Sequence, residues 1–166
     1  MAKVINIIGC GSNVGKTILM EGLISELKNR GLRVSTIKHD VHGFDIDKKG
    51  KDTYRHREAG AETVIISSKN RFAMIKETTE EVDLYDILKM VIDKDVVLVE
   101  GYKRSALRKI EVFRDEVSTE IITPKDKLIA IASNSKLEYN NVPIIKKDNY
   151  KLLADLVEKE KEFRFE

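Results

Sequence analysis

The segment that most limits the possible folds is VINIIGCGSNVGKTIL, residues 4–19, in which an apolar run leads through a glycine-rich turn into a helical pattern. The apolar run at residues 4–8 predicts a buried strand. Apolar side chains then recur at helical spacing over residues 17–30, and Gly31 follows as a residue suited to a helix end. A strand, a tight glycine turn and a helix in this order are typical of an α/β fold that binds ligands at the carboxyl ends of its strands.

Strand-like and helical patterns alternate along the rest of the chain. We expect further strands over residues 33–38, 63–67, 72–76, 96–99, 110–113 and 128–132. We expect further helices over residues 52–59, 83–92 and 149–161. The connection between the third and fourth strands is short, which favours an antiparallel pair. The chain is therefore expected to form one α/β domain over residues 1–166, with a mainly parallel sheet and an antiparallel hairpin.

The glycine turn is similar to a phosphate-binding loop, but its spacing is unusual. The usual pattern is glycine, four residues and then Gly-Lys-Ser/Thr, and it places Cys10 where glycine is expected. In this interpretation, backbone N–H groups surround a β-phosphate, Lys16 reaches the β/γ oxygens and Thr17 holds Mg²⁺. The nucleotide-binding residues assigned to the loop are Gly11, Ser12, Asn13, Val14, Gly15, Lys16 and Thr17. The alternative is an ordinary strand-to-helix turn that contains Gly-Lys-Thr.

A carboxylate follows the most apolar strand, in the sequence DVVLVEGYKR. A phosphate loop that uses Mg²⁺ needs a carboxylate at the end of a neighbouring buried strand, and Glu100 is in the right place for it. Gly101 would let the chain leave the sheet beside a ligand. The alternative is a solvated residue at a strand end.

Composition limits the partners and the compartment. Lys+Arg 30 against Asp+Glu 28 gives a net charge of +2, a balance that argues against nucleic acid or a membrane surface as partner. No apolar run approaches the roughly 20 residues of a spanning helix, and no signal peptide is visible, so we expect a cytosolic protein. Cys10 is the single cysteine, which fits a reducing compartment and leaves no thiolate zinc cluster.

Two longer stretches resemble a known family. The segments GLRVSTIKHDVHGFDIDKKGKDTYRHREAGAETVIISS and VVLVEGYKRSALRKIEVFR are similar to molybdopterin-guanine dinucleotide biosynthesis protein B, MobB. The resemblance implies a three-layer P-loop NTPase fold and a homodimer that binds GTP and Mg²⁺, with slow GTP hydrolysis. It also implies an accessory role in molybdenum cofactor synthesis, beside a MobA-like molybdopterin guanylyltransferase and molybdopterin or the molybdenum cofactor itself. Dethiobiotin synthetase, in the same wider group, has a loop of glycine, five residues and Gly-Lys-Thr.

The resemblance also assigns roles outside the loop. It makes Glu100 the metal carboxylate, with Lys16 as its catalytic companion, and Asp52 a second acidic group near Mg²⁺. Asp52 is equally well explained as a helix N-cap. Lys38 is counted among the nucleotide-binding residues, and Asn134 is the candidate for the base edge. A guanine-reading Asn-Lys-x-Asp motif is absent, so the choice of GTP over ATP depends on the resemblance.

Two further groups of side chains stay open to two explanations. His39 and His42 are either transition-metal ligands or polar loop residues, and two histidines without a third ligand favour the second explanation. Six cations are expected near the strand ends, where they form either an anion site or docking face, or a solvated surface. These cations are Arg55, Arg57, Lys103, Arg104, Arg108 and Lys109.

Two other functions compete with the accessory role. One is an ATP-dependent small-molecule ligase or kinase of the dethiobiotin synthetase type. The other is a non-catalytic adaptor in which nucleotide sets the shape of the dimer. Product formation from ATP, or tight GTP binding without turnover, would distinguish these two from a slow GTPase.

Overall fold

The computed structural model describes residues 2–11, 13–139 and 141–165, and it divides into two compact units. The first unit comprises residues 1–39 and 87–166, and the second comprises residues 40–86. That the chain acts as a single nucleotide-binding domain stays a prediction.

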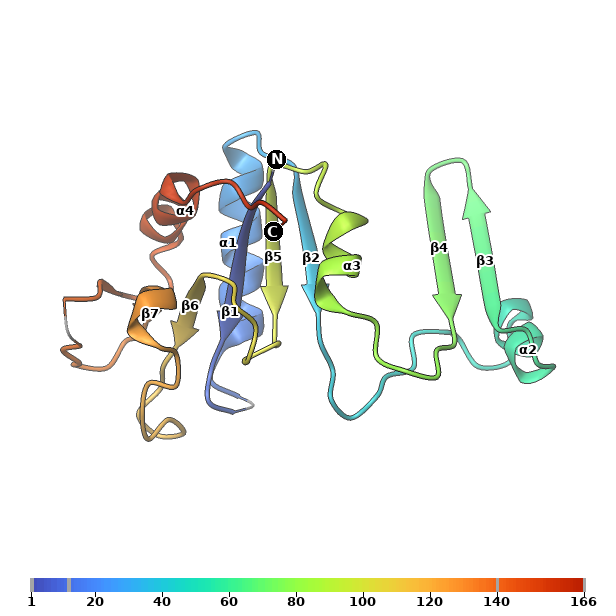
Figure 1. Ribbon diagram of the computed structural model, residues 1–166, viewed down its shortest axis with the longest axis horizontal. Coiled ribbons are helices and arrows are strands. Elements are labelled where there is room, and N and C mark those ends of the chain that lie inside the picture. Colours follow the sequence, from blue (N-terminus) through green and yellow to red (C-terminus); the bar gives the residue numbers. More distant parts are fainter. Residues whose placement is uncertain (1, 12, 140, 166) are drawn as a thin grey trace. The chain divides into compact units, whose positions relative to one another are not determined.

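The first unit is built on a six-stranded sheet in which all neighbouring strands are parallel (Figure 1). Its strands, in spatial order, are β2 (Val34–Lys38), β5 (Val96–Glu100), β1 (Lys3–Ile8), β6 (Lys109–Val112), β7 (Leu128–Ala132) and β8 (Ile144–Ile145). The chain crosses from β1 over β5 to β2, and later from β5 over β1 to β6. Such a reversal of direction creates the crevice in which open α/β sheets bind ligands.

Helices α1 (Lys16–Asn29) and α4 (Tyr150–Lys159) contact each other and the same face of the sheet. α1 contributes Leu19, Leu23 and Leu27 to the core, and α4 contributes Leu153 and Val157. The opposite face of β1 is buried as well, because all its residues from Val4 to Ile8 are buried. Two shorter helices are α3 (Leu84–Lys89) and the 3₁₀ helix η1 (Lys125–Lys127).

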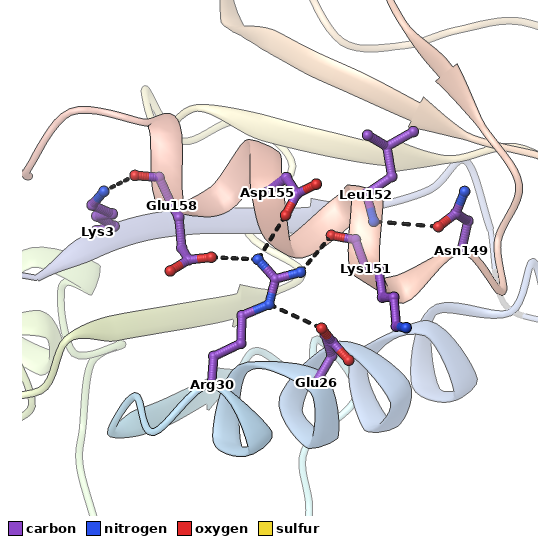
Figure 2. A network of polar contacts seen from close by, with 8 residues as sticks. All are labelled: Lys3, Glu26, Arg30, Asn149, Lys151, Leu152, Asp155 and Glu158. Atoms are coloured by element: carbon purple, nitrogen blue, oxygen red, sulfur yellow. Dashed lines mark hydrogen bonds and ion pairs between the residues drawn. The ribbon is translucent and has the colours of Figure 1, made fainter.

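A polar network joins α1 to α4 (Figure 2). Arg30 donates to Asp155 at 2.7 Å, to Glu26 at 2.9 Å and also to Glu158. These hydrogen bonds raise the pKa of Arg30. Asn149 caps α4, because its Oδ1 accepts from the first-turn backbone N–H of Leu152 at 3.3 Å. The network therefore fixes the helix that follows the glycine turn.

The second unit holds α2 (Asp52–Glu58) and the antiparallel hairpin β3 (Thr63–Ser68) with β4 (Arg71–Lys76). Val64 of β3 is buried, and α2 contacts β3. Arg57 of α2 pairs with Glu77 at 2.8 Å and also lies 3.5 Å from Asp45. Val64 and Leu84 are its buried apolar side chains, and a group of ion pairs around Arg57 adds to them.

The predicted α/β fold, with a mainly parallel sheet and an antiparallel hairpin, is confirmed. The ends of most elements lie within a residue of the expected ones, whereas α3 is several residues shorter. The two-residue strand β8 was not predicted, because two residues carry no periodicity. In the described part of the chain, no helix combines the length and apolar character that crossing a membrane needs.

Candidate functional site

The glycine loop, residues 9–15, connects the carboxyl end of β1 to the first turn of α1. Gly15 is the N-cap of α1 and has a φ of +102°, and Asn13 has a φ of +62°. Glycine and asparagine tolerate this left-handed conformation best. Val14, between them, is fully buried in the core and anchors the loop. No side chain among the described residues caps α1, and the N–H groups of a first helical turn are suited to binding an anion.

The unusual spacing of the loop has a steric explanation. A Cβ atom at Gly9 would lie 2.6 Å from Cγ2 of Val14 and 3.0 Å from the carbonyl oxygen of Val112, so only glycine fits. A Cβ at Gly11 would meet no atom within 4 Å. The glycine that the fold requires is therefore Gly9, which five residues separate from Gly15. A side chain is accommodated at Cys10, whose thiol donates to the carbonyl oxygen of Val117 at 3.2 Å.

Two lysine ammonium groups lie on consecutive carbonyls of this loop. Nζ of Lys16 donates to the carbonyl oxygen of Gly11 at 2.6 Å, and Nζ of Lys103 donates to that of Cys10 at 2.8 Å. The two lysines come from different parts of the fold, one from α1 and one from the segment after β5. Ser12, which was predicted to bind nucleotide, lies outside the described residues.

The charges around Lys16 sum to an excess of positive charge. Burial lowers the pKa of Lys16, Glu100 raises it, and the neighbouring charges of Lys103 and Lys38 lower it. Three ammonium groups thus share this region with the carboxylate of Glu100. A polyanion such as a nucleotide phosphate chain would relieve their repulsion.

Glu100 ends β5 and lies between β1 and β2, with Ile7 and Lys38 as its partners in register. The chain turns sharply after it, because Gly101 has a φ of +89° and a Cβ there would lie 3.0 Å from Cβ of His39. The carboxylate of Glu100 and the hydroxyl of Thr17 are the hard oxygen ligands that Mg²⁺ prefers. No group of three or more His, Cys, Asp or Glu side chains suited to a metal occurs within the described ranges. This donor set fits Mg²⁺ held by few protein ligands, phosphate and water, and it gives no support to a transition-metal site at His39 and His42.

Asp52 belongs to the second unit, where it is the first residue of α2. Lys51 occupies the N-cap position, so the proposed N-cap role of Asp52 is wrong by one residue. An acidic side chain in the first turn still complements the helix dipole. Its role near Mg²⁺ stays a prediction.

Asn134 follows β7, and its side-chain oxygen accepts from the backbone N–H of Lys147 at 3.1 Å. Nζ of Lys147 lies 4.0 Å from the position that a Cβ at Gly15 would take. The segment after β8 therefore adjoins the glycine loop, which the sequence analysis missed. The sequence feature that could have indicated this is the pair Lys146 and Lys147, directly after the apolar residues of β8.

Three of the six cations that were expected to form either an anion site or docking face, or a solvated surface, make contacts within the fold. Lys109 is buried, and its Nζ donates to the carbonyl and hydroxyl oxygens of Ser105, both at 2.9 Å. Arg108 pairs with Glu160 at 3.2 Å. Arg57 forms the ion pairs described above.

Comparisons with known proteins agree with one another. The family model of molybdopterin guanine dinucleotide synthesis protein B, MobB, matches residues 4–134. A molybdopterin-guanine dinucleotide biosynthesis adapter protein of Escherichia coli is 40% identical over 152 residues, which are 88% of this chain and 86% of that protein. The adapter protein of the same name from Haemophilus influenzae is 38% identical over 150 residues, 89% and 83% of the two chains. The crystal structure of Bacillus subtilis MobB is similar with a TM-score of 0.73 and 22% identity, covering 95% of this chain and 99% of that one. At that identity the structural likeness shows the fold alone.

Proposed function

The chain belongs to the MobB family, and we propose that it is an adapter of molybdopterin-guanine dinucleotide synthesis that binds GTP and Mg²⁺ at the glycine loop. The observation that best supports nucleotide binding is the positive charge around the loop. The charges of Lys38 and Lys103 lower the pKa of Lys16 there, and the charge of Glu100 raises it. Two of the ammonium groups contact only carbonyl oxygens of the loop in the contacts described above, and phosphate oxygens are stronger acceptors.

The residues have separate tasks in this proposal. The N–H groups at the start of α1 bind the β-phosphate, and Lys16 leaves the carbonyl of Gly11 to neutralise the β/γ oxygens. Thr17 and Glu100 would hold Mg²⁺, which would neutralise the charge that develops on the phosphate oxygens. Hydrolysis is slow, as suits a protein whose nucleotide state guides a partner. Asn134, fixed by Lys147, meets the base edge.

The names of the relatives give them an adapter role in molybdopterin-guanine dinucleotide biosynthesis. An adapter needs partners in that synthesis, and we propose a MobA-like molybdopterin guanylyltransferase, with molybdopterin or the molybdenum cofactor as the shared small molecule. The single cysteine fits work in the reducing cytosol. A pull-down of the guanylyltransferase by this protein, with and without GTP and Mg²⁺, tests the adapter role. Capture that needs neither nucleotide nor metal would contradict it.

Two variants test the nucleotide site by calorimetry. Lys16→Ala should weaken GTP binding at least tenfold, about 1.4 kcal/mol, with the circular dichroism spectrum unchanged. Glu100→Gln should abolish the Mg²⁺ dependence of binding and leave affinity in EDTA almost unaltered. Unchanged affinity of the first variant, or equal loss with and without metal in the second, would contradict the site. Tight ATP binding with little GTP binding would favour the ligase or kinase alternative.

A second copy of the chain is the proposed partner of the hairpin. Ile65 and Met74 are directly opposite each other, Phe72 lies on the same face, and they are 57%, 48% and 66% exposed. A two-stranded ribbon with such a face is rarely stable alone in water. Ile65→Asp should convert a micromolar dimer to a monomer in sedimentation velocity experiments. Ile66→Asp is the matched control, because Ile66 is also 57% exposed but points to the other face. A monomeric wild type, or dissociation by both variants alike, would contradict this interface.

A further inference from the structure

The turn at residues 102–105, directly after Glu100 and Gly101, is fixed by two buried polar side chains. Nδ2 of Asn6 donates to the carbonyl oxygen of Tyr102 at 3.1 Å and to Oγ of Ser105 at 3.0 Å. Lys109 donates to the carbonyl and hydroxyl oxygens of Ser105. Asn6 and Lys109 are 0% and 1% exposed. Asn6 comes from the middle of β1 and Lys109 from the start of β6, so the core of the sheet holds this turn.

The other side of the turn is fixed as well. The ring of Tyr102 stacks on His39 with 4.2 Å between ring centroids. The backbone N–H of His39 donates to the carbonyl oxygen of Glu100 at 2.9 Å, which ties the end of β5 to the end of β2. The backbone of Lys103 is therefore held in place, and its exposed side chain is the part that can move.

From this fixed turn, Lys103 reaches the glycine loop and lies on the carbonyl oxygen of Cys10, next to Lys16 on the carbonyl of Gly11. Lys16 comes from the helix side of the loop. Lys103 comes from the segment directly after Glu100, the residue that would hold Mg²⁺. Because Mg²⁺ in phosphoryl-transfer sites serves the β/γ end of the nucleotide, we expect a cation from this side to approach the γ-phosphate.

Building on the proposed function, we propose that Lys103 is a second phosphate-binding lysine that contacts the γ-phosphate, so that the protein distinguishes a nucleoside triphosphate from a diphosphate. The hydrogen bonds that the buried side chains of Asn6 and Lys109 donate to Ser105 position it. On binding, the ammonium group of Lys103 exchanges the carbonyl of Cys10 for a phosphate oxygen, which is a stronger, charged acceptor. A diphosphate has no γ-phosphate oxygen, so the ammonium group of Lys103 stays on the carbonyl oxygen of Cys10.

Calorimetry with GDP and with a non-hydrolysable GTP analogue, both with Mg²⁺, tests this role. Lys103→Ala should weaken binding of the triphosphate analogue about tenfold or more, and binding of GDP less than about twofold. Lys103→Gln should behave in the same way, because glutamine keeps a hydrogen-bond donor for the carbonyl of Cys10 and loses the charge. Arg104→Ala is the matched control, since Arg104 is an exposed cation in the same turn, and both affinities should stay unchanged.

Each other outcome overturns the inference in a recognisable way. Equal loss for both nucleotides would show that Lys103 only shapes the loop. Wild-type affinity of Lys103→Gln for the triphosphate analogue would show that its charge is not used. A wild-type protein that binds neither nucleotide would reject the proposed GTP site itself, and the role of Lys103 with it.

Discussion

Lys109 should make the stability of this protein depend on pH in the alkaline range. The lysine is buried at the start of β6, and its Nζ finds only neutral oxygen acceptors in Ser105 among the contacts described above. Burial, and to a smaller extent the charge of Lys127, lowers the pKa of Lys109 from 10.5 to about 8. The perturbation that isolates this group is Lys109→Met, which keeps the length of the side chain and removes the charge.

The sign and size follow from proton linkage. Between pH 8 and pH 10.5 the unfolded chain holds the proton of Lys109 and the folded chain does not, so the free energy of unfolding rises with pH. One pKa unit corresponds to about 1.4 kcal/mol, so the full effect is about 3 kcal/mol. The cost of burying the charge is thus present below pH 8 and disappears as the pH approaches 10.5.

Urea unfolding followed by far-ultraviolet circular dichroism measures this effect. The chain has no tryptophan, and tyrosine emission changes as the phenol ionises. The free energy of unfolding of the wild type minus that of Lys109→Met should rise by about 3 kcal/mol from pH 7 to pH 10.5. Other titrating groups cancel in this difference, and the lost hydrogen bonds to Ser105 shift its level but not its slope.

A difference that stays constant over this range would refute the reasoning. If the variant does not fold, the ¹³Cε shift of Lys109 in the unaltered protein gives the answer directly. A titration midpoint near pH 8 supports the argument, and a midpoint near 10.5 refutes it.

Three substitutions test other parts of the structure. Gly9→Ala would place a Cβ 2.6 Å from Cγ2 of Val14, so thermal unfolding should show a loss of roughly 1–3 kcal/mol; an unchanged melting temperature would mean that the loop simply shifts. Gly101→Ala puts a side chain at a φ of +89°, and we expect a loss of about 1–3 kcal/mol together with weaker GTP binding by calorimetry; wild-type values of both would contradict the strained turn. Asn149→Ala removes the cap on the N–H of Leu152 and should cost about 1 kcal/mol in urea unfolding, with GTP affinity unaltered; no loss would mean that water replaces the cap.

The parts of the fold that the sequence predicted are those with local signals. The residues of β5 are apolar on both sides of the strand, so a buried parallel strand was the natural interpretation. The glycine turn before α1 and the Glu-Gly pair after β5 mark where the chain changes direction, and parallel strands bring these points to one edge. Lys38 and Glu100 are partners in register at the ends of β2 and β5, and both charges affect the pKa of Lys16; the role of these residues in nucleotide binding stays a prediction.

The parts that the sequence did not predict depend on distant partners. Strand β6 contains Lys109 and Glu111, and charged residues normally mark an exposed face, but both are buried. Glu111 is satisfied by the backbone N–H groups of Ile122 and Thr123, at 3.0 and 2.9 Å. No local pattern reports that a carboxylate will meet two N–H groups more than ten residues away. Lys147 beside the glycine loop is a similar case, because its approach depends on how β8 joins the sheet.

Composition also concealed the electrostatics of the site, because net charge is a sum over the whole chain. The value of +2 argued only against nucleic acid or a membrane surface as partner, so any basic site had to be local. Arg30 and Arg108 are each held by carboxylates. At the glycine loop the balance is different, since Lys38 and Lys103 add positive charge around Lys16 and Glu100 is the carboxylate that opposes it. Salt screens charges beyond about 8 Å, so the effect of this local excess stays near the loop. The proposed nucleotide binding therefore requires no net positive charge on the whole chain: it requires a fold that brings several lysines to one strand edge.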